Sequence, residues 1–148
     1  MKKAFLFVCA LSILAISAYA QKKISESSVP QVVKAKFSAL YPGSKVEYWS
    51  LEGANYVAEF MDQKKEMTIF IAPDAKNYKT EMRIHPSELP KEAKEYIAKH
   101  YPGKKITDAV TSADEAGNRI YEAEVSELDL IFDGKGKFLK SVKERAIE

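Results

Sequence analysis

The chain has 148 residues, of which 23 are lysine or arginine and 21 are aspartate or glutamate, and this length is enough for one domain with a sizeable core. The near balance of charge leaves no basic excess with which to bind nucleic acid or an anionic membrane surface.

Residues 1–20 have the layout of a secretory signal peptide. Lys2 and Lys3 precede an apolar run, and Ala18 and Ala20 supply small residues at the −3 and −1 positions of a cleavage site. The apolar run is shorter than the ~20 residues of a membrane span. Cleavage removes the only cysteine, Cys9, and with it any disulfide, thiol nucleophile or cysteine metal site. We expect a periplasmic or secreted protein with no membrane span after cleavage.

The chain after the cleavage site begins with a polar stretch and a helical pattern. Residues 21–28 are short on apolar side chains, which indicates a flexible lead-in. Pro30 fits a first helical turn, and Pro42 ends the helix because the residue before a proline is pushed out of the α region. The apolar positions between them follow helical spacing and predict an amphipathic helix: Val33, Phe37, Leu40 and Tyr41.

Four β-like runs follow this helix, over residues 45–52, 55–61, 66–72 and 76–84. Apolar and polar residues alternate along them, and Gly53 and Pro73 mark turns between them. Period-two alternation indicates an antiparallel sheet with one buried face.

The same plan then occurs a second time. Pro30 and Tyr41 recur sixty positions later as Pro90 and Tyr101, and strand-like runs follow at 104–113, 119–126, 128–132 and 137–142. The sequence predicts an α+β fold of two tandem helix-plus-four-strand repeats, residues 29–84 and 89–148, with 85–88 as a short connector. Together they would form one compact unit, an antiparallel sheet of eight strands with both helices packed on one face.

The alternation also predicts which side chains point away from the helices. That set consists of Trp49, Leu51, Val57, Glu59 and Phe70 in the first repeat and Glu122 and Glu124 in the second, with Ala109 aligned to Trp49. Large apolar groups beside polar ones often mark interaction sites, and tryptophan is a favoured interface anchor. The alternatives are that the tail or a loop covers these residues, or that a one-residue slip exchanges the two faces.

The sequence shows no nucleophile motif and no histidine pair at metal-ligand spacing. His100 stands where Leu40 stands in the first repeat, which favours a packed or half-buried role over catalysis. Glu122 and Glu124 share one strand face and could do acid–base work, but a solvated strand face is the commoner outcome. Asp129 and Asp133 are weak calcium candidates, because the ligand series of a calcium loop is missing. We therefore expect no enzyme and no cofactor.

The Val-Pro…Tyr-Pro-Gly helix, the Tyr-x-Ala-Glu-Phe strand and the Ile-Phe-Asp-x-x-Gly turn resemble the PepSY-like periplasmic proteins, which are similar to the β-lactamase-inhibitor-protein fold. The resemblance covers about residues 29 to 143. It implies tandem repeats and a non-catalytic role in binding or inhibiting another envelope protein. The sequence hypothesis is a binding module that uses the open side of its sheet. The alternative is a small-ligand or calcium-responsive periplasmic sensor or carrier.

Overall fold

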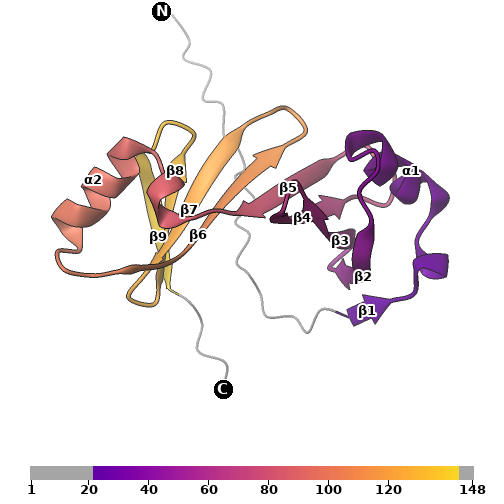
Figure 1. Ribbon diagram of the computed structural model, residues 1–148, viewed down its shortest axis with the longest axis horizontal. Helices are drawn as coiled ribbons and strands as arrows, with labels where there is room; N and C mark the ends of the chain where they lie inside the picture. The colour runs from indigo at the N-terminus through magenta and orange to yellow at the C-terminus, as the bar shows by residue number, and fades with distance from the viewer. Residues whose placement is uncertain (1–21, 144–148) are drawn as a thin grey trace, which may run out of the picture.

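The computed structural model describes residues 22–143, and the expected signal peptide therefore lies outside the described residues. Nine strands form a single antiparallel sheet, in which each strand pairs with the next one in the chain from β1 to β9. Figure 1 shows this sheet as the body of the molecule, with α1 toward one end and α2 toward the other. The predicted α+β class and single antiparallel sheet are confirmed.

The elements keep the predicted order. The first half contains β1 (Lys22–Ile24), the 3-10 turn η1 (Glu26–Ser28), α1 (Gln31–Leu40), β2 (Val46–Glu52), β3 (Asn55–Asp62), β4 (Lys65–Ile71) and β5 (Tyr78–Arg83). The second half contains the 3-10 turn η2 (Pro86–Glu88), α2 (Lys91–His100), β6 (Ile106–Asp114), β7 (Arg119–Val125), β8 (Leu128–Asp133) and β9 (Phe138–Lys143).

Part of the predicted flexible lead-in 21–28 forms regular structure, since residues 22–24 are β1 and residues 26–28 are η1, whereas residue 21 lies outside the described residues. Lys22, Lys23 and Ile24 pair with Leu51, Ser50 and Trp49 of β2, which adds a ninth strand to the eight predicted. Ile24 packs against the core cluster that lies under α1, so its burial helps to hold this short strand in place.

Proline sets the two ends of each helix. In α1, the backbone N–H of Tyr41 donates to the carbonyl of Phe37 at 2.9 Å, immediately before Pro42 stops the helix. Tyr101 and Ile97 make the equivalent bond in α2 at 2.8 Å. The two helices therefore end in the same way, as the sequence pattern predicted.

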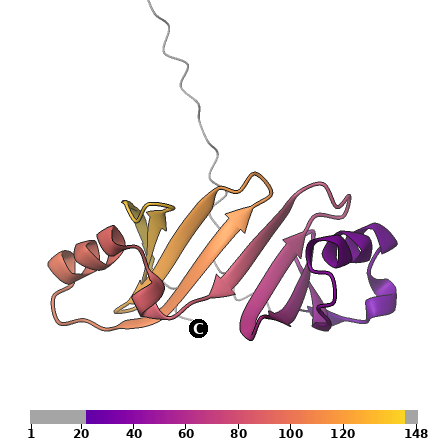
Figure 2. The same cartoon turned by 45° about the horizontal axis from the view of Figure 1, so that its top comes forward.

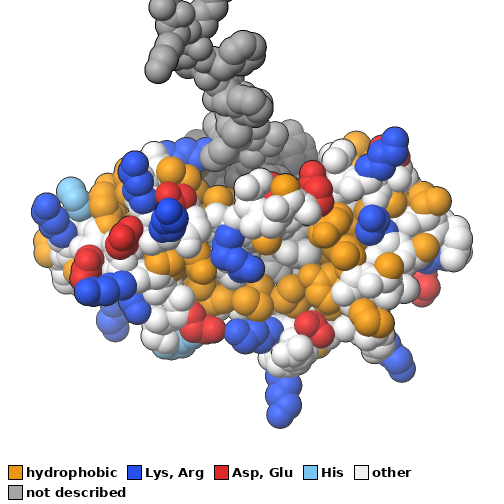
Figure 3. Space-filling model, turned by 90° about the horizontal axis from the view of Figure 1, so that it is seen from above, with side chains coloured by type: hydrophobic (Ala, Val, Ile, Leu, Met, Phe, Trp, Pro, Cys, Tyr) orange, Lys and Arg blue, Asp and Glu red, His pale blue; other side chains and the backbone are white. Residues whose placement is uncertain are grey.

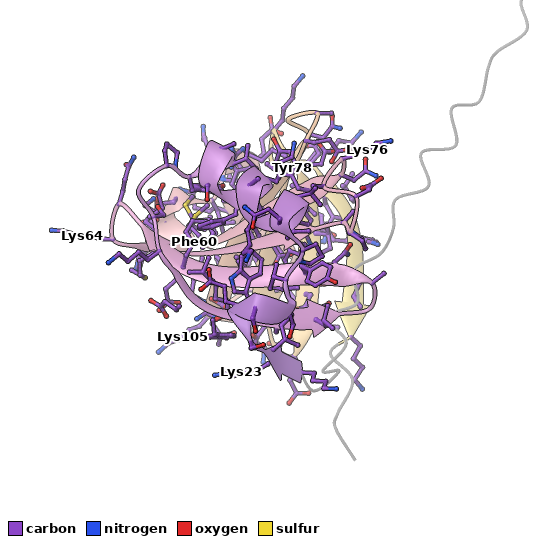
Figure 4. All side chains as sticks on the ribbon, turned by 90° about the vertical axis from the view of Figure 1, so that its right-hand side faces the viewer. Lys23, Phe60, Lys64, Lys76, Tyr78 and Lys105 are labelled. Carbon is purple, nitrogen blue, oxygen red and sulfur yellow. The ribbon has the colours of Figure 1, made fainter. Side chains whose placement is uncertain are left out.

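Each helix packs on its own part of the sheet. Val33 and Phe37 of α1 lie in a core cluster with Phe60, whereas Ala93 and Ile97 of α2 lie in a separate cluster. Figure 2 shows the two helices far apart on the sheet, and Figure 4 shows Phe60 in the end that carries α1. Both helices thus cover one face of the sheet, at its two ends.

The first long strand of each half contains a β-bulge. Val46 pairs with Phe60, but the next pair is Tyr48 with Glu59, so Glu47 is an extra residue in β2. The same shift occurs in β6 between Ile106 and Asp108, where Thr107 is the extra residue. A bulge reverses the alternation of side chains beyond it, because two residues then oppose one on the partner strand.

The halves join through β5 and β6. Five residue pairs connect these strands, from Lys79 with Asp114 to Arg83 with Val110. Arg83 also forms an ion pair with Asp108 of β6, with Nε 3.1 Å from Oδ1. The sheet therefore runs without a break from the first half into the second. Seen from above, hydrophobic side chains gather between the two ends of the molecule (Figure 3).

Candidate functional site

The side of the sheet that faces away from the two helices, which we call the open face, carries two matching rows of side chains. Strand pairing places Ser50, Val57, Phe70 and Lys79 side by side across β2 to β5, in what we call the first row. It places Val110, Glu122, Ile131 and Lys140 across β6 to β9, in the second row.

Packing shows that these rows lie on the side opposite the helices. Their strand neighbours Ala58 and Ile69 belong to the α1 cluster, and Ala123 and Leu130 belong to the α2 cluster. Successive side chains of a strand point to opposite faces, so the rows point the other way. Val57 is 0% exposed and yet belongs to neither cluster, which makes it a buried residue of the open face.

Two of the residues predicted for the open face lie on the helix side. Trp49 is 4% exposed and its ring meets Phe37 edge to face, in the core under α1. Leu51 pairs with Tyr56, which packs on the same core. The prediction for both is wrong because the bulge at Glu47 reverses the alternation in the rest of β2. The matching bulge at Thr107 turns Ala109 into the α2 core.

The other predicted residues point as expected. Glu59, Phe70, Glu122 and Glu124 pair with open-face residues of the neighbouring strands. Val57 also points away from the helices, but it has no exposed surface and cannot act as a contact residue. A binding role for the whole set stays a prediction.

One end of the open face is built around Tyr48, which the sequence reasoning missed. A hydrogen bond between the Tyr48 side chain and Glu59 raises the pKa of the tyrosine to about 12, and burial adds to this shift. Lys23 of β1 places its Nζ 4.0 Å from the centroid of the Tyr48 ring. Knowing the bulge would have placed Tyr48 here, since it comes directly after Glu47.

The middle of the open face holds a charged pair beside an aromatic ring. Lys79 Nζ lies 4.6 Å from the centroid of the Phe70 ring and forms an ion pair with Glu81. Phe70 is half-buried. Arg83, on the same strand, reaches both Glu66 and Asp108. Lys79 and Arg83 are therefore engaged with acidic neighbours of the same face.

Glu122 is the carboxylate that the fold perturbs most on this face. Burial raises its pKa to about 7, and the negative charges of Asp129 and Glu81 add to the shift. Its side chain makes no hydrogen bond or ion pair with the other residues of the described range 22–143. Ionisable groups with strongly shifted pKa values cluster at functional sites, so Glu122 is the strongest single candidate here.

The calcium candidates lie apart. Asp129 pairs with Glu124 on the open face. Asp133 lies at the β8–β9 turn, where its Oδ1 accepts hydrogen bonds from the backbone N–H groups of Lys135 and Lys137, both at 2.9 Å. These two bonds account for the aspartate as a turn residue. No group of three or more histidine, cysteine, aspartate or glutamate side chains within the described chain could hold a metal ion.

The two histidines, His85 and His100, each contact neighbouring residues of the fold. The Nδ1 atom of His85 accepts a hydrogen bond from the Ser87 backbone at 3.2 Å and caps η2. His100 stacks on Tyr96 with ring centroids 4.3 Å apart, but it is exposed, so the packed or half-buried role expected for it is wrong. In the described part of the chain, no helix is long and apolar enough to cross a membrane.

Comparison with solved structures shows the same fold in three Bacteroides proteins. A structure from Bacteroides eggerthii, described as that of "putative periplasmic proteins", matches with a TM-score of 0.70 and 19% identity over 77% of this chain and 88% of that chain. A DUF2874 family protein from Bacteroides uniformis matches with a TM-score of 0.70 and 19% identity, over 76% of this chain and 88% of that chain.

A BLIP-like protein from Bacteroides fragilis matches with a TM-score of 0.66 and 20% identity, over 80% of this chain and 89% of that chain. No curated protein matches the chain. One family model matches it twice, over residues 17–76 and 55–140. Since these matches cover most of the sequence, the chain belongs to the PepSY-like family described as "Putative beta-lactamase-inhibitor-like, PepSY-like".

Proposed function

We propose that this protein is an exported, non-catalytic binding module that engages or inhibits another protein of the periplasm or envelope through the open face of its sheet. The observation that carries the proposal is the open face itself, where apolar side chains of the two rows lie beside carboxylates of the same strands, on the side of the sheet opposite the helices. A sheet face with this mixture suits protein contacts better than it suits chemistry on a small substrate.

The family and the similar structures support the proposal. The family description is inhibitor-like rather than catalytic. A periplasmic location agrees with the description of the Bacteroides eggerthii structure and with the signal-peptide pattern of residues 1–20.

The two halves act as tandem repeats of one unit in this proposal. Each half has a helix followed by four strands, and the bulges at Glu47 and Thr107 occupy the same place in the two halves. The double match of the family model agrees with this reading. Two repeats side by side give the face its width.

The test is a pull-down from the native envelope fraction with the mature chain as bait, followed by a binding measurement with the purified partner. Phe70→Ser removes the half-buried ring of the first row. Val32→Ser is the matched control, because Val32 is 54% exposed and lies on α1, away from the open face. Both variants must first show the wild-type circular dichroism spectrum.

The proposal expects a partner that Val32→Ser binds as wild type does and that Phe70→Ser binds at least tenfold more weakly. A partner bound equally by both variants would move the site off the open face. No partner at all, together with a melting temperature raised by millimolar calcium, would favour the calcium-responsive sensor instead.

A further inference from the structure

The two rows of the open face differ at one position in a way that the fold does not require. Val57 is flanked by Ser50 and Phe70 in the first row, and Glu122 is flanked by Val110 and Ile131 at the corresponding place in the second. Val57 has no exposed surface, and Ile131 is only 6% exposed. A carboxylate thus occupies a place that a valine fills in the other half.

The charges around Glu122 do not compensate for this burial. The charged groups of other strands that act on it are Asp129 of β8, Glu81 and Lys79 of β5, and Asp108 of β6. Glu124 follows on its own strand, and Arg83 and Lys140 stand at the two ends of the second row. Lys79 already pairs with Glu81, and Arg83 with Asp108 and Glu66, so these two cations are committed elsewhere.

A half-buried carboxylate without an ion pair is unfavourable when it is ionised, since water and hydrogen-bond donors are partly withdrawn from it. A cation placed against the carboxylate would supply the missing ion pair. The same low-dielectric surroundings would strengthen the attraction between the two charges. The surrounding acidic groups act in the same direction, because they attract a positive group and repel a negative one.

We propose that the partner of the open face places a lysine or arginine side chain against Glu122, with apolar groups of the partner beside Val110. This inference rests on the proposed function and names the chemistry that the partner must present. The partner is thus a protein that presents a basic residue between apolar ones on its surface. Its binding is coupled to proton release near neutral pH, because the cation favours the ionised form of Glu122.

The experiment uses a defined probe and does not depend on finding the natural partner. Acetyl-Leu-Arg-Leu-amide is titrated into the mature protein, and binding is followed by the 13C carboxyl shift of Glu122. The matched probe replaces arginine by citrulline, which has nearly the same shape but no charge. The variants are Glu122→Gln and, as a control on the surface of α2, Glu92→Gln.

We expect the arginine peptide to bind at least tenfold more tightly than the citrulline peptide at pH 8 and to lower the pKa of Glu122 by one unit or more. Glu122→Gln abolishes this preference and Glu92→Gln keeps it. The preference also disappears in the wild type at pH 5.5, where Glu122 is protonated. Equal binding of the two peptides at pH 8, or a preference that survives in Glu122→Gln, overturns the inference.

The same variant separates this inference from the proposed function. A captured envelope partner that is lost with Phe70→Ser, but binds Glu122→Gln as tightly as wild type at both pH 5.5 and pH 8, leaves the binding module in place and rejects the cation. A captured partner that binds at least tenfold more tightly at pH 8 than at pH 5.5, with no such difference in Glu122→Gln, supports both.

Discussion

The rings of Trp49 and Phe37 meet edge to face, with their centroids 6.1 Å apart and their planes at 74°. This contact joins β2 to α1 and lies in the core cluster of the first half. Edge-to-face aromatic pairs add about 0.5–1.5 kcal/mol to the gain from burial alone. Trp49 is therefore a stability residue, and its role can be tested as one.

Replacing Trp49 by alanine removes this contact and leaves a large cavity under α1. We expect the free energy of unfolding to fall by about 3–5 kcal/mol, as for other buried aromatic residues. Urea denaturation followed by circular dichroism measures the change. A loss below about 1 kcal/mol would show that the side chain is not packed in the core.

Gly136 has a left-handed backbone and a close neighbour, and the two effects can be separated. Its φ is +90°, and a Cβ at this position would lie 2.7 Å from Pro90 Cβ and 2.9 Å from the backbone nitrogen of Ala93, at the start of α2. Gly43 has nearly the same φ, +89°, but nothing within 4 Å of its Cβ position. Gly43 is thus a matched control for the strain of a positive φ.

We expect Gly43→Ala to cost about 1 kcal/mol, from the backbone conformation alone. Gly136→Ala adds the collision with the first turn of α2, which raises the cost by a further ~1–3 kcal/mol. Thermal unfolding of the two variants measures the difference. Equal melting temperatures would mean that the β8–β9 turn yields without disturbing α2.

Ser50, in the first row, has a buried hydroxyl that reduces the stability of the fold. Ser50 is 0% exposed and its Oγ has no hydrogen-bond partner among the described residues. A buried hydroxyl without a partner costs about 1–3 kcal/mol. We expect Ser50→Ala to leave the fold unchanged and to raise the free energy of unfolding by up to about 1 kcal/mol. A clear fall in stability would indicate a hydrogen bond to Ser50 in solution.

Because the pKa of Glu122 is raised in the folded state, this residue makes the free energy of unfolding fall as the pH rises. The pKa rises from 4.5 to about 7 on folding, so the folded state holds the proton more tightly than the unfolded state. The stabilisation from that proton is fully present below pH 4.5, falls between pH 4.5 and 7, and is lost above about pH 7. The whole shift corresponds to about 3 kcal/mol.

Glu122→Val places in the second row the residue that the first row has at this position. We expect it to remove the fall in stability between pH 4.5 and 7 and to be more stable than wild type at pH 8 by up to about 3 kcal/mol. Urea denaturation over this pH range measures both effects, and Glu124→Gln shows how much comes from removing any negative charge from β7. A wild-type pH profile in Glu122→Val would assign the dependence to another group.

The parts of the fold that follow from local patterns could be predicted from the sequence. The two prolines around each helix and the alternation along Tyr56 to Phe60 locate α1, α2 and the faces of β3. The bulges could not be predicted, because Glu47 and Thr107 look like ordinary strand residues until the partner strand is known. Because the bulge in β2 was not foreseen, the alternation predicted Trp49 on the open face, whereas it lies on the helix side.

The rest of the candidate site depends on contacts between distant segments. Lys22 and Lys23 show no strand alternation, and β1 exists because Ile24 finds a place on the first core. The burial of Glu122 is set by neighbours on β5, β6 and β8. Such an environment is a property of the assembled sheet, and a reading along one strand cannot detect it.

The separation of the two core clusters has a mechanical consequence. The clusters under α1 and α2 share no residue, and five residue pairs of β5 and β6 join the halves. A change of twist at this seam strains hydrogen bonds and the Arg83–Asp108 ion pair, and it moves Met82 of β5, which packs against the α2 cluster, relative to β6. The angle across the seam sets how the two rows are inclined to each other, and with it the width of the surface that they present.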